Sequence, residues 1–136
     1  MASIGTPHNP SDVWTVPEAF RTIYTHAVEV RTPARLLLIS GQFGVAPDLV
    51  VSPEFADQLE QAMANIEALL RSASMDTTNM VKVTYYLTRT GDLPVLGQIR
   101  RQRWASSEPP AVTVLVVSAL ARPDCLVEVE VVAVAE

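Results

Sequence analysis

Residues 126–135, LVEVEVVAVA, are the most informative segment of this chain for its fold. Valine and other apolar residues dominate this stretch, which favours a β-strand. Its two glutamates, Glu128 and Glu130, are two positions apart, so both point to one face of a regular strand. Residues 112–119 predict a second valine-rich strand, and a turn around Arg122-Pro123-Asp124 separates the two. We therefore expect a β-sheet that carries an acidic pair on one of its strands.

Three further strands are predicted nearer the N-terminus. Residues 80–88 alternate between apolar and polar side chains, as in a strand with one buried face. Residues 25–30 and 35–40 predict two strands joined by a turn at Arg31-Thr32-Pro33. Residues 1–18 contain several prolines and little periodicity, which predicts an N-terminal arm without regular structure.

Two helices are predicted between these strands. Ser52-Pro53-Glu54 is typical of a helix start, with Ser52 as the N-cap and Pro53 in the first turn. Apolar residues then recur at steps of three and four as far as Ala73, and residues 92–104 return to the same spacing. The order β-β-α-β-α-β-β predicts a single α+β domain over residues 1–136. Right-handed crossovers would place both helices on one face of its mixed sheet.

Composition and charge argue against several classes of protein. A hydrophobic fraction of 49% argues against disorder. The formal net charge of -5 disfavours nucleic acid as a partner, because phosphate binding needs a local excess of lysine and arginine. The chain shows neither a signal-peptide pattern nor the roughly 18 apolar residues of a membrane span. The single cysteine, Cys125, suits a reducing compartment. We therefore expect a cytoplasmic protein without a membrane partner.

The predicted strands also indicate an oligomer. Two helices cover one face of the sheet, yet residues 36–39 and 114–117 are apolar on both faces. The uncovered face would measure roughly 600 Å², which approaches the roughly 800 Å² that each partner contributes to an ordinary stable interface. Because an open apolar surface of that size would aggregate, we expect the sheets of neighbouring subunits to meet.

Three short motifs occur in a characteristic order: Ser40-Gly41-Gln42, Pro109-Pro110-Ala111 and the first half of the last strand. Together they resemble the signature of the RidA/YjgF family, the reactive enamine/imine deaminases once also called L-PSP endoribonucleases. The resemblance covers roughly residues 24–135. It implies a chorismate-mutase-like α+β fold and a homotrimer with three clefts between subunits, where a small-molecule ligand binds.

The resemblance also implies the roles of four residues. Glu128 matches the glutamate that orients the attacking water. Ser40 and Gly41 match the element that presents a hydroxyl and a backbone N–H to the ligand, and Tyr24 matches a tyrosine that lines the cleft. Hydrolysis of a C=N bond needs a water and an acceptor for its proton, and desolvation makes a carboxylate a better base by raising its pKa. Glu130, on the same strand face, is expected to titrate together with Glu128.

One position departs from the family pattern. Val112 stands where the family's deaminases place an arginine that holds the substrate carboxylate with two parallel hydrogen bonds. Valine supplies no donor, so we expect little deamination of 2-aminoacrylate. Four arginines are candidates to replace the lost one: Arg35, Arg100, Arg103 and Arg122.

Two interpretations of function stay open. The first is a RidA-like hydrolase of an enamine, imine or related C–N compound, with water positioned by Glu128. The second is a non-catalytic trimer that binds a small metabolite in the same clefts. Ribonuclease activity is disfavoured by the acidic net charge. No metal or other cofactor is expected, because no second histidine or acid has metal-ligand spacing around His26. The structural alternative for both glutamates is a strand that merely borders solvent.

Overall fold

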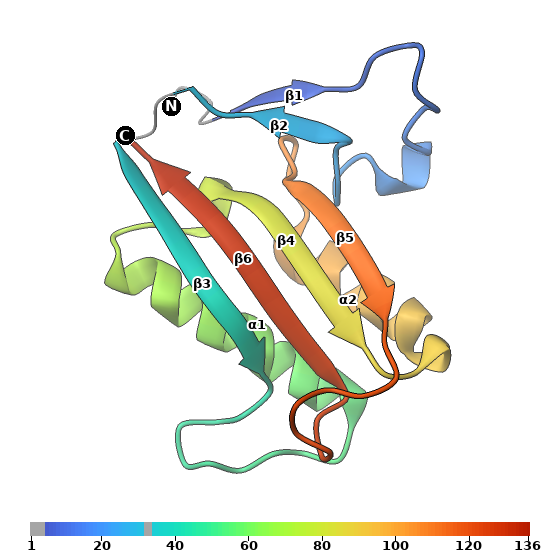
Figure 1. Cartoon of the computed structure of the whole chain (residues 1–136), viewed down its shortest axis with the longest axis vertical. Helices are drawn as coiled ribbons and strands as arrows, with labels where there is room; N and C mark the ends of the chain where they lie inside the picture. Colours follow the sequence, from blue (N-terminus) through green and yellow to red (C-terminus); the bar gives the residue numbers. More distant parts are fainter. Residues whose placement is uncertain (1–4, 32–33) are drawn as a thin grey trace.

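The computed structural model describes residues 5–31 and 34–136, and Figure 1 shows a twisted sheet with two helices behind it. Short 3₁₀ turns lie at Glu18–Phe20, Thr77–Asn79 and Thr90–Asp92. The strands and helices follow in the order β1 (Thr6–His8), β2 (Ala27–Glu29), β3 (Arg35–Phe43), α1 (Phe55–Ser72), β4 (Met80–Leu87), α2 (Leu93–Trp104), β5 (Ala111–Val116) and β6 (Val127–Ala135).

The main sheet has four strands in the order β3-β6-β4-β5. Strand β6 is antiparallel to both of its neighbours, whereas β5 runs parallel to β4. A parallel pair needs a crossover connection, and α2 provides it. Both helices lie on the same face of this sheet (Figure 1). The predicted α+β fold, a mixed sheet with two helices on one face, is confirmed.

The N-terminal region differs from the prediction. Residues 6–8, inside the predicted arm, form strand β1, which pairs antiparallel with β2 in a separate two-stranded sheet. The predicted strand at residues 25–30 is present as β2 but does not pair with β3; beside it, an isolated bridge joins Thr25 to Ala111 at the start of β5. A three-residue strand next to prolines is too short to show a periodicity of two. The predicted turn at Arg31-Thr32-Pro33 lies partly outside the described residues.

The core forms between α1 and the covered face of the sheet. The apolar stripe of α1 is confirmed, and Leu59, Met63 and Ile66 are fully buried. In β6 the odd-numbered residues are buried against the helices, so Glu128 and Glu130 point to the other face. Register and burial thus set the direction of the acidic pair.

The start of α1 lies later than predicted. The helix begins at Phe55 with Glu54 as its N-cap, not Ser52. The Ser52 hydroxyl instead accepts a hydrogen bond from the Glu54 N–H at 3.1 Å and donates to the Asp57 carboxylate at 2.9 Å. Ser52 therefore stabilises the approach to the helix by an internal hydrogen bond rather than by capping it.

The buried Gln58 of α1 connects this helix to the start of β6. Its side-chain carbonyl accepts the Leu126 N–H at 2.7 Å, and its amide donates to the carbonyls of Asp124 and Ser52 at 3.0 and 2.8 Å. All of these partners are backbone groups, so Gln58 fixes the backbone two residues before Glu128.

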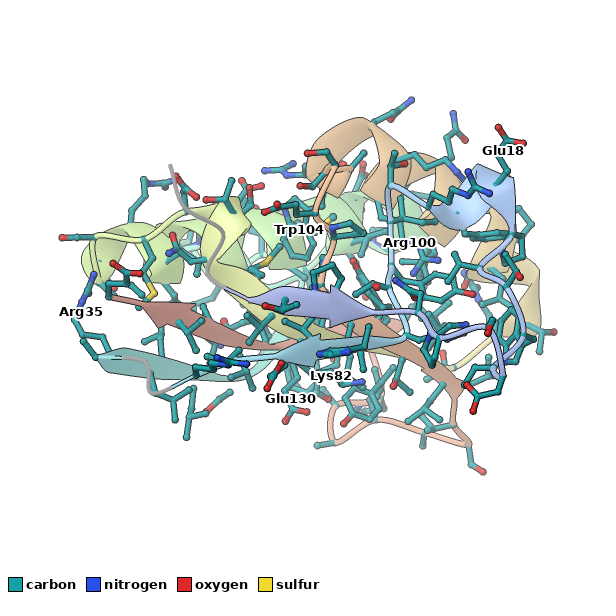
Figure 2. The ribbon with its side chains drawn as sticks, turned by 90° about the horizontal axis from the view of Figure 1, so that it is seen from above. Glu18, Arg35, Lys82, Arg100, Trp104 and Glu130 are labelled. Atoms are coloured by element: carbon teal, nitrogen blue, oxygen red, sulfur yellow. The ribbon has the colours of Figure 1, made fainter. Side chains whose placement is uncertain are left out.

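The uncovered face of the sheet is more polar than predicted. Its edges are apolar, with Leu36, Leu38 and Leu115 exposed by 58%, 70% and 43%. The central strands carry polar side chains on this face. In Figure 2, Lys82 and Glu130 point away from the helices, whereas Arg100 and Trp104 lie on the helix side. The polar residues of the face are Lys82, Thr84, Tyr86, Thr113, Glu128 and Glu130.

A charged cluster joins the two helices. Arg103 of α2 donates two hydrogen bonds to the carboxylate of Glu67 on α1, at 2.8 and 2.7 Å. The indole N–H of Trp104 donates to the same carboxylate at 2.9 Å. The Arg103 hydrogen bond holds the pKa of Glu67 below its ordinary value, although burial acts in the opposite direction.

We expect Glu67→Gln to lower the free energy of unfolding by about 1–3 kcal/mol at pH 7, because hydrogen bonds to charged groups are lost from a half-buried site. The folded-state pKa of Glu67 lies below the unfolded value of about 4.3, so its stabilisation is present above that pH. It is lost as the pH falls through the folded-state pKa. Urea unfolding at pH 7 and pH 3 measures both effects.

The matched control is Glu60→Gln, which removes one contact of 3.2 Å to the same arginine from a carboxylate that is 50% exposed. We expect a change below about 0.5 kcal/mol for this variant. Equal losses in the two variants, or a Glu67→Gln effect that does not shrink at pH 3, would contradict the assignment.

Candidate functional site

The acidic pair of β6 lies on the uncovered face beside β4. Glu128 stands opposite Tyr86, and Glu130 stands opposite Thr84. The Tyr86 hydroxyl donates to Glu130 at 3.2 Å. Burial, and to a smaller extent the charge of Glu130, raise the pKa of Glu128. These are the two causes that the sequence indicated, and a raised pKa makes Glu128 a stronger base than an ordinary carboxylate.

A β-bulge in β3 brings Ser40 and Gly41 to this pair. Ile39 pairs with Val131 and Gln42 pairs with Val129, so Ser40 and Gly41 together face the single residue between them on β6. A Cβ atom placed on Gly41 would lie 1.9 Å from Oε1 of Glu128. Glycine at this position therefore lets the carboxylate of Glu128 approach the backbone of β3 closely.

Of the other predicted residues, Tyr24 belongs to an aromatic cluster at the N-terminal segment. Tyr24 follows the Glu18–Phe20 turn, and its ring centroid lies 6.5 Å from Trp14 and 5.9 Å from His26. The Trp14 and His26 rings meet edge-on at 4.8 Å, and Nε2 of His26 donates to the Trp14 carbonyl at 2.6 Å. The N-terminal segment thus packs on the domain through Trp14.

Asn9 holds this cluster against β5. Its amide group donates to the Thr25 hydroxyl at 2.7 Å, and its carbonyl accepts the His26 N–H at 3.0 Å. The Thr25 N–H in turn donates to the carbonyl of Pro110 at 3.1 Å. The Pro109-Pro110-Ala111 motif therefore connects the tyrosine segment to the strand that carries Val112.

A cavity of about 480 Å³ opens between the aromatic cluster, β5 and α2. Val112 pairs with the fully buried Val83, and its side chain packs against the core on the helix side of the sheet. Arg100 of α2 lies on this same side (Figure 2). The cavity is lined by Trp14, Tyr24, Thr25, His26, Arg100, Val112 and Val114.

The structure places the predicted site residues in two groups. The first group lies on the uncovered face: Ser40, Gly41, Glu128 and Glu130. Tyr24 and Val112 belong to the cavity on the helix side, and neither glutamate lines that cavity. A single chain therefore does not bring all the predicted residues into one pocket.

Three of the four candidate arginines are engaged in structural contacts. Arg35 donates to the carbonyl of Ala73, Arg122 pairs with Asp124 at 3.0 Å, and Arg103 holds Glu67 as described above. Arg100 instead lines the cavity beside Val112. It follows the buried Leu96 by four positions, but Arg103 follows the buried Ile99 in the same way, so this spacing does not separate the two arginines in the sequence.

No group of three or more histidine, cysteine, aspartate or glutamate side chains within residues 5–31 and 34–136 is arranged to hold a metal ion. Over the same residues, no helix has the length and apolar character needed to cross a membrane.

Comparisons with known proteins point to one family. The model of the family described as Endoribonuclease L-PSP matches residues 17–135. A RutC family protein of Aquifex aeolicus is 34% identical over 98% of this chain and 99% of its own length. The human 2-iminobutanoate/2-iminopropanoate deaminase is 35% identical over 63% of this chain and 62% of its own.

A solved structure supports the same relationship. The Rid family protein YyfB of Yersinia pestis, a protein of unknown function, superimposes with a TM-score of 0.82 at 25% identity. The match covers 96% of this chain and 98% of that protein. The shared fold therefore extends over nearly the whole chain, including most of the N-terminal segment.

Proposed function

This chain belongs to the Endoribonuclease L-PSP family, which includes the Rid proteins, and on that premise we propose that it is a small-molecule hydrolase acting on an enamine, imine or related C–N compound. The observation that carries the proposal is Glu128, a partly buried carboxylate with a raised pKa placed directly over Gly41. Relatives named as 2-iminobutanoate/2-iminopropanoate deaminases support the reaction class.

In the proposed reaction, Glu128 takes a proton from a water molecule as the water oxygen attacks the carbon of the C=N bond. The proton passes to the nitrogen, and collapse of the resulting carbinolamine releases ammonia and a carbonyl product. An enamine first tautomerises to the imine: its carbon gains a proton and its nitrogen loses one. The Ser40 hydroxyl and the Gly41 N–H hold a polar atom of the substrate. The negative charge of Glu130 contributes to the raised pKa of Glu128 and so makes it a stronger base.

The proposed site is completed between subunits of a homotrimer. The acidic group of one subunit would face the cavity with Tyr24 and Val112 of its neighbour, because one chain holds the two groups on different sides of its sheet. The exposed Leu36 and Leu38 at the edge of the uncovered face would be buried in this assembly. The acidic net charge and the single free thiol, Cys125, support a cytoplasmic protein that does not bind nucleic acid.

We expect the wild-type protein to be a trimer at micromolar concentration and Leu38→Glu to dissociate it. Leu38 is 70% exposed in the single chain, so its burial in the interface would stabilise each subunit contact by about 1.5–3 kcal/mol. Glutamate there would instead bury a charge without a partner. Light scattering coupled to gel filtration should show the mass fall to the 14.8 kDa of one chain.

The control is Leu69→Glu, because Leu69 is 38% exposed on α1, away from the uncovered face of the sheet. This variant should keep the mass of the trimer. A wild-type protein that is a stable monomer, or a Leu38→Glu variant of unchanged mass, would refute the proposed assembly.

The second candidate function is a trimer that captures a small metabolite without converting it. The observation that favours it is Val112, which leaves the usual position of the carboxylate-holding arginine without a donor. Ligand binding to a protein that releases no ammonia from any imine or enamine would select this alternative.

A further inference from the structure

Arg100 is buried in an unusual way for an arginine. Only 8% of its surface is exposed, and within the described part of the chain its Nε and Nη1 atoms have no hydrogen-bond partner. Its guanidinium carbon lies 5.7 Å from the centroid of the Tyr85 ring. The ionisable groups that act on it are Tyr85, Arg101 and Tyr24, so no carboxylate compensates its charge.

A buried guanidinium without a partner is costly, and native proteins retain such groups chiefly where something else satisfies them. Arginine stays protonated in proteins, so Arg100 does not escape the cost by becoming neutral. The ring of Tyr85 offers a cation–π contact, but it supplies no acceptor for the N–H donors at the edge of the guanidinium. The unsatisfied donors therefore need an acceptor from outside the chain, and the uncompensated charge favours an anionic one.

The cavity beside Arg100 has the size and lining of a ligand site. Its volume of about 480 Å³ falls within the roughly 300–1,000 Å³ of typical small-molecule pockets. Val112 and Val114 make one wall apolar, and Trp14, Tyr24 and His26 form an aromatic wall. The lining contains a single arginine among valine, aromatic and Thr25 side chains, so the cavity suits a monoanion with an organic body better than a phosphate dianion.

We propose that Arg100 is the residue that binds the carboxylate of a small organic acid in this cavity. The planar guanidinium and a carboxylate match in two parallel hydrogen bonds, which would satisfy donors that the fold leaves free. This inference rests on the proposed function where it identifies the acid as the substrate, an imine or enamine with a carboxylate. Anion binding is then kept despite Val112, because Arg100 on α2 supplies the donors that the family's arginine would supply from β5.

Position determines which acids fit. Arg100 extends from the helix behind the sheet, whereas the family's arginine would extend from β5 at residue 112. The carboxylate would consequently lie deeper on the helix side. We therefore expect acids in which one or more carbons separate the carboxylate from the C=N or C=O carbon to bind better than acids whose carboxylate is attached directly to that carbon.

The test measures binding of non-reactive probes by titration calorimetry on the full-length protein. The probes are pyruvate and straight-chain oxo acids in which one or two CH₂ groups separate the carbonyl carbon from the carboxylate, each compared with the matching oxo amide. We expect wild type to bind the best acid roughly 10- to 100-fold more tightly than its amide, as charged hydrogen bonds provide. Arg100→Gln should lose this preference. Arg100→Lys should retain part of it, because lysine keeps the positive charge but cannot make the two parallel hydrogen bonds of a guanidinium.

The matched control is Arg101→Gln. Arg101 is the next residue on α2, and its guanidinium lies 5.0 Å from the ring of Phe20 and donates to the carbonyl of Ala19. It should keep the preference for acids. Thermal unfolding without ligand should show Arg100→Gln as stable as wild type or more so, since the variant removes an unpaired buried charge. A large loss of stability in Arg100→Gln would show that Arg100 also supports the fold, and Arg100→Lys then carries the test of acid binding.

The proposal is overturned if wild type binds acids and amides equally, or if the preference survives in Arg100→Gln. The acid-over-amide preference of wild type, with the intermediate Arg100→Lys, decides the matter even if Arg100→Gln fails to fold. Because the readout is binding, it separates this inference from the hydrolase proposal. Preferential binding of acids without turnover of any imine would refute the hydrolase alone, and turnover of neutral imines without preference for acids would refute the role of Arg100 alone.

Discussion

Glu128→Gln should abolish turnover, lowering kcat by about 10²- to 10⁴-fold, the range typical of a lost general base. The amide keeps the volume of the side chain and one acceptor oxygen, but it does not take a proton from water. Because the side chain remains close to Gly41, the trimer and the affinity for a non-reactive ligand should stay nearly unchanged. Ammonia release, measured with an imine or enamine substrate, gives the rate.

The matched variant is Glu130→Gln, which should lower the rate less. Glu130 receives the Tyr86 hydroxyl and influences Glu128 through its charge, a smaller contribution than burial to the pKa of Glu128. In wild type, kcat/KM should fall as the pH drops through the raised pKa of Glu128, above the ordinary glutamate value of about 4.3. In Glu130→Gln this acidic limb should move to lower pH, because one negative neighbour has gone.

Two outcomes would remove Glu128 from the mechanism. Full activity of Glu128→Gln would mean that another base acts, and His26 in the cavity of the aromatic cluster would be the next candidate. Dissociation of the trimer in the same variant would assign the glutamate a structural role. Gel filtration of every variant alongside the kinetics distinguishes these outcomes.

The parts of the fold that local periodicity encodes were predictable from the sequence. The stripe of α1 and the alternation of β6 each repeat over enough residues to set the buried face, and with it the direction of Glu128. The bulge at Ser40-Gly41 was not predictable in detail, because it depends on which residues of β6 lie opposite. Strand β1 was missed for a similar reason, since its pairing with β2 is a tertiary contact.

Less of the candidate site than of the fold was predictable from the sequence. The sequence named Glu128 and Val112 from motifs, yet it gave no indication that the two lie on opposite faces of the sheet. It placed Arg100 among four candidates, and only burial together with the unpaired Nε and Nη1 distinguishes this residue. The polarity of the uncovered face was partly predictable, because the alternation of β4 placed Lys82 and Thr84 on it. What these side chains would contact in the proposed trimer depends on a neighbouring subunit, which local periodicity does not encode.

2-Aminoacrylate should be a poor substrate of the wild-type protein, about 30- to 1000-fold slower in kcat/KM than in an arginine-bearing relative. That range corresponds to the roughly 2–4 kcal/mol of a lost bidentate, charge-assisted contact. The carboxylate of this three-carbon acid is attached directly to the reacting carbon. Arg100, on α2, would hold it away from the water of Glu128, so Arg100 does not compensate for Val112 with this substrate.

Moving the guanidinium should restore the activity. In Arg100→Gln with Val112→Arg the single cation extends from β5, and the loss of Arg100 prevents repulsion between two arginines in one cavity. We expect 2-aminoacrylate turnover to rise by about 30-fold or more over wild type, with the preference for acids of more distant carboxylate lost. Pyruvate formation from 2-aminoacrylate generated in the assay, corrected for spontaneous hydrolysis, measures the rate.

The matched control is Arg100→Gln with Val112→Met, which adds bulk at residue 112 without charge and should show no gain. Wild-type turnover of 2-aminoacrylate at the rate of an arginine-bearing relative would contradict the importance of residue 112. A stable double variant that binds pyruvate but gains no activity would show that the position of the carboxylate is not what limits the rate. Because the cavity already accommodates a buried guanidinium next to the half-buried Val112, the exchange tests the place of the charge rather than its presence.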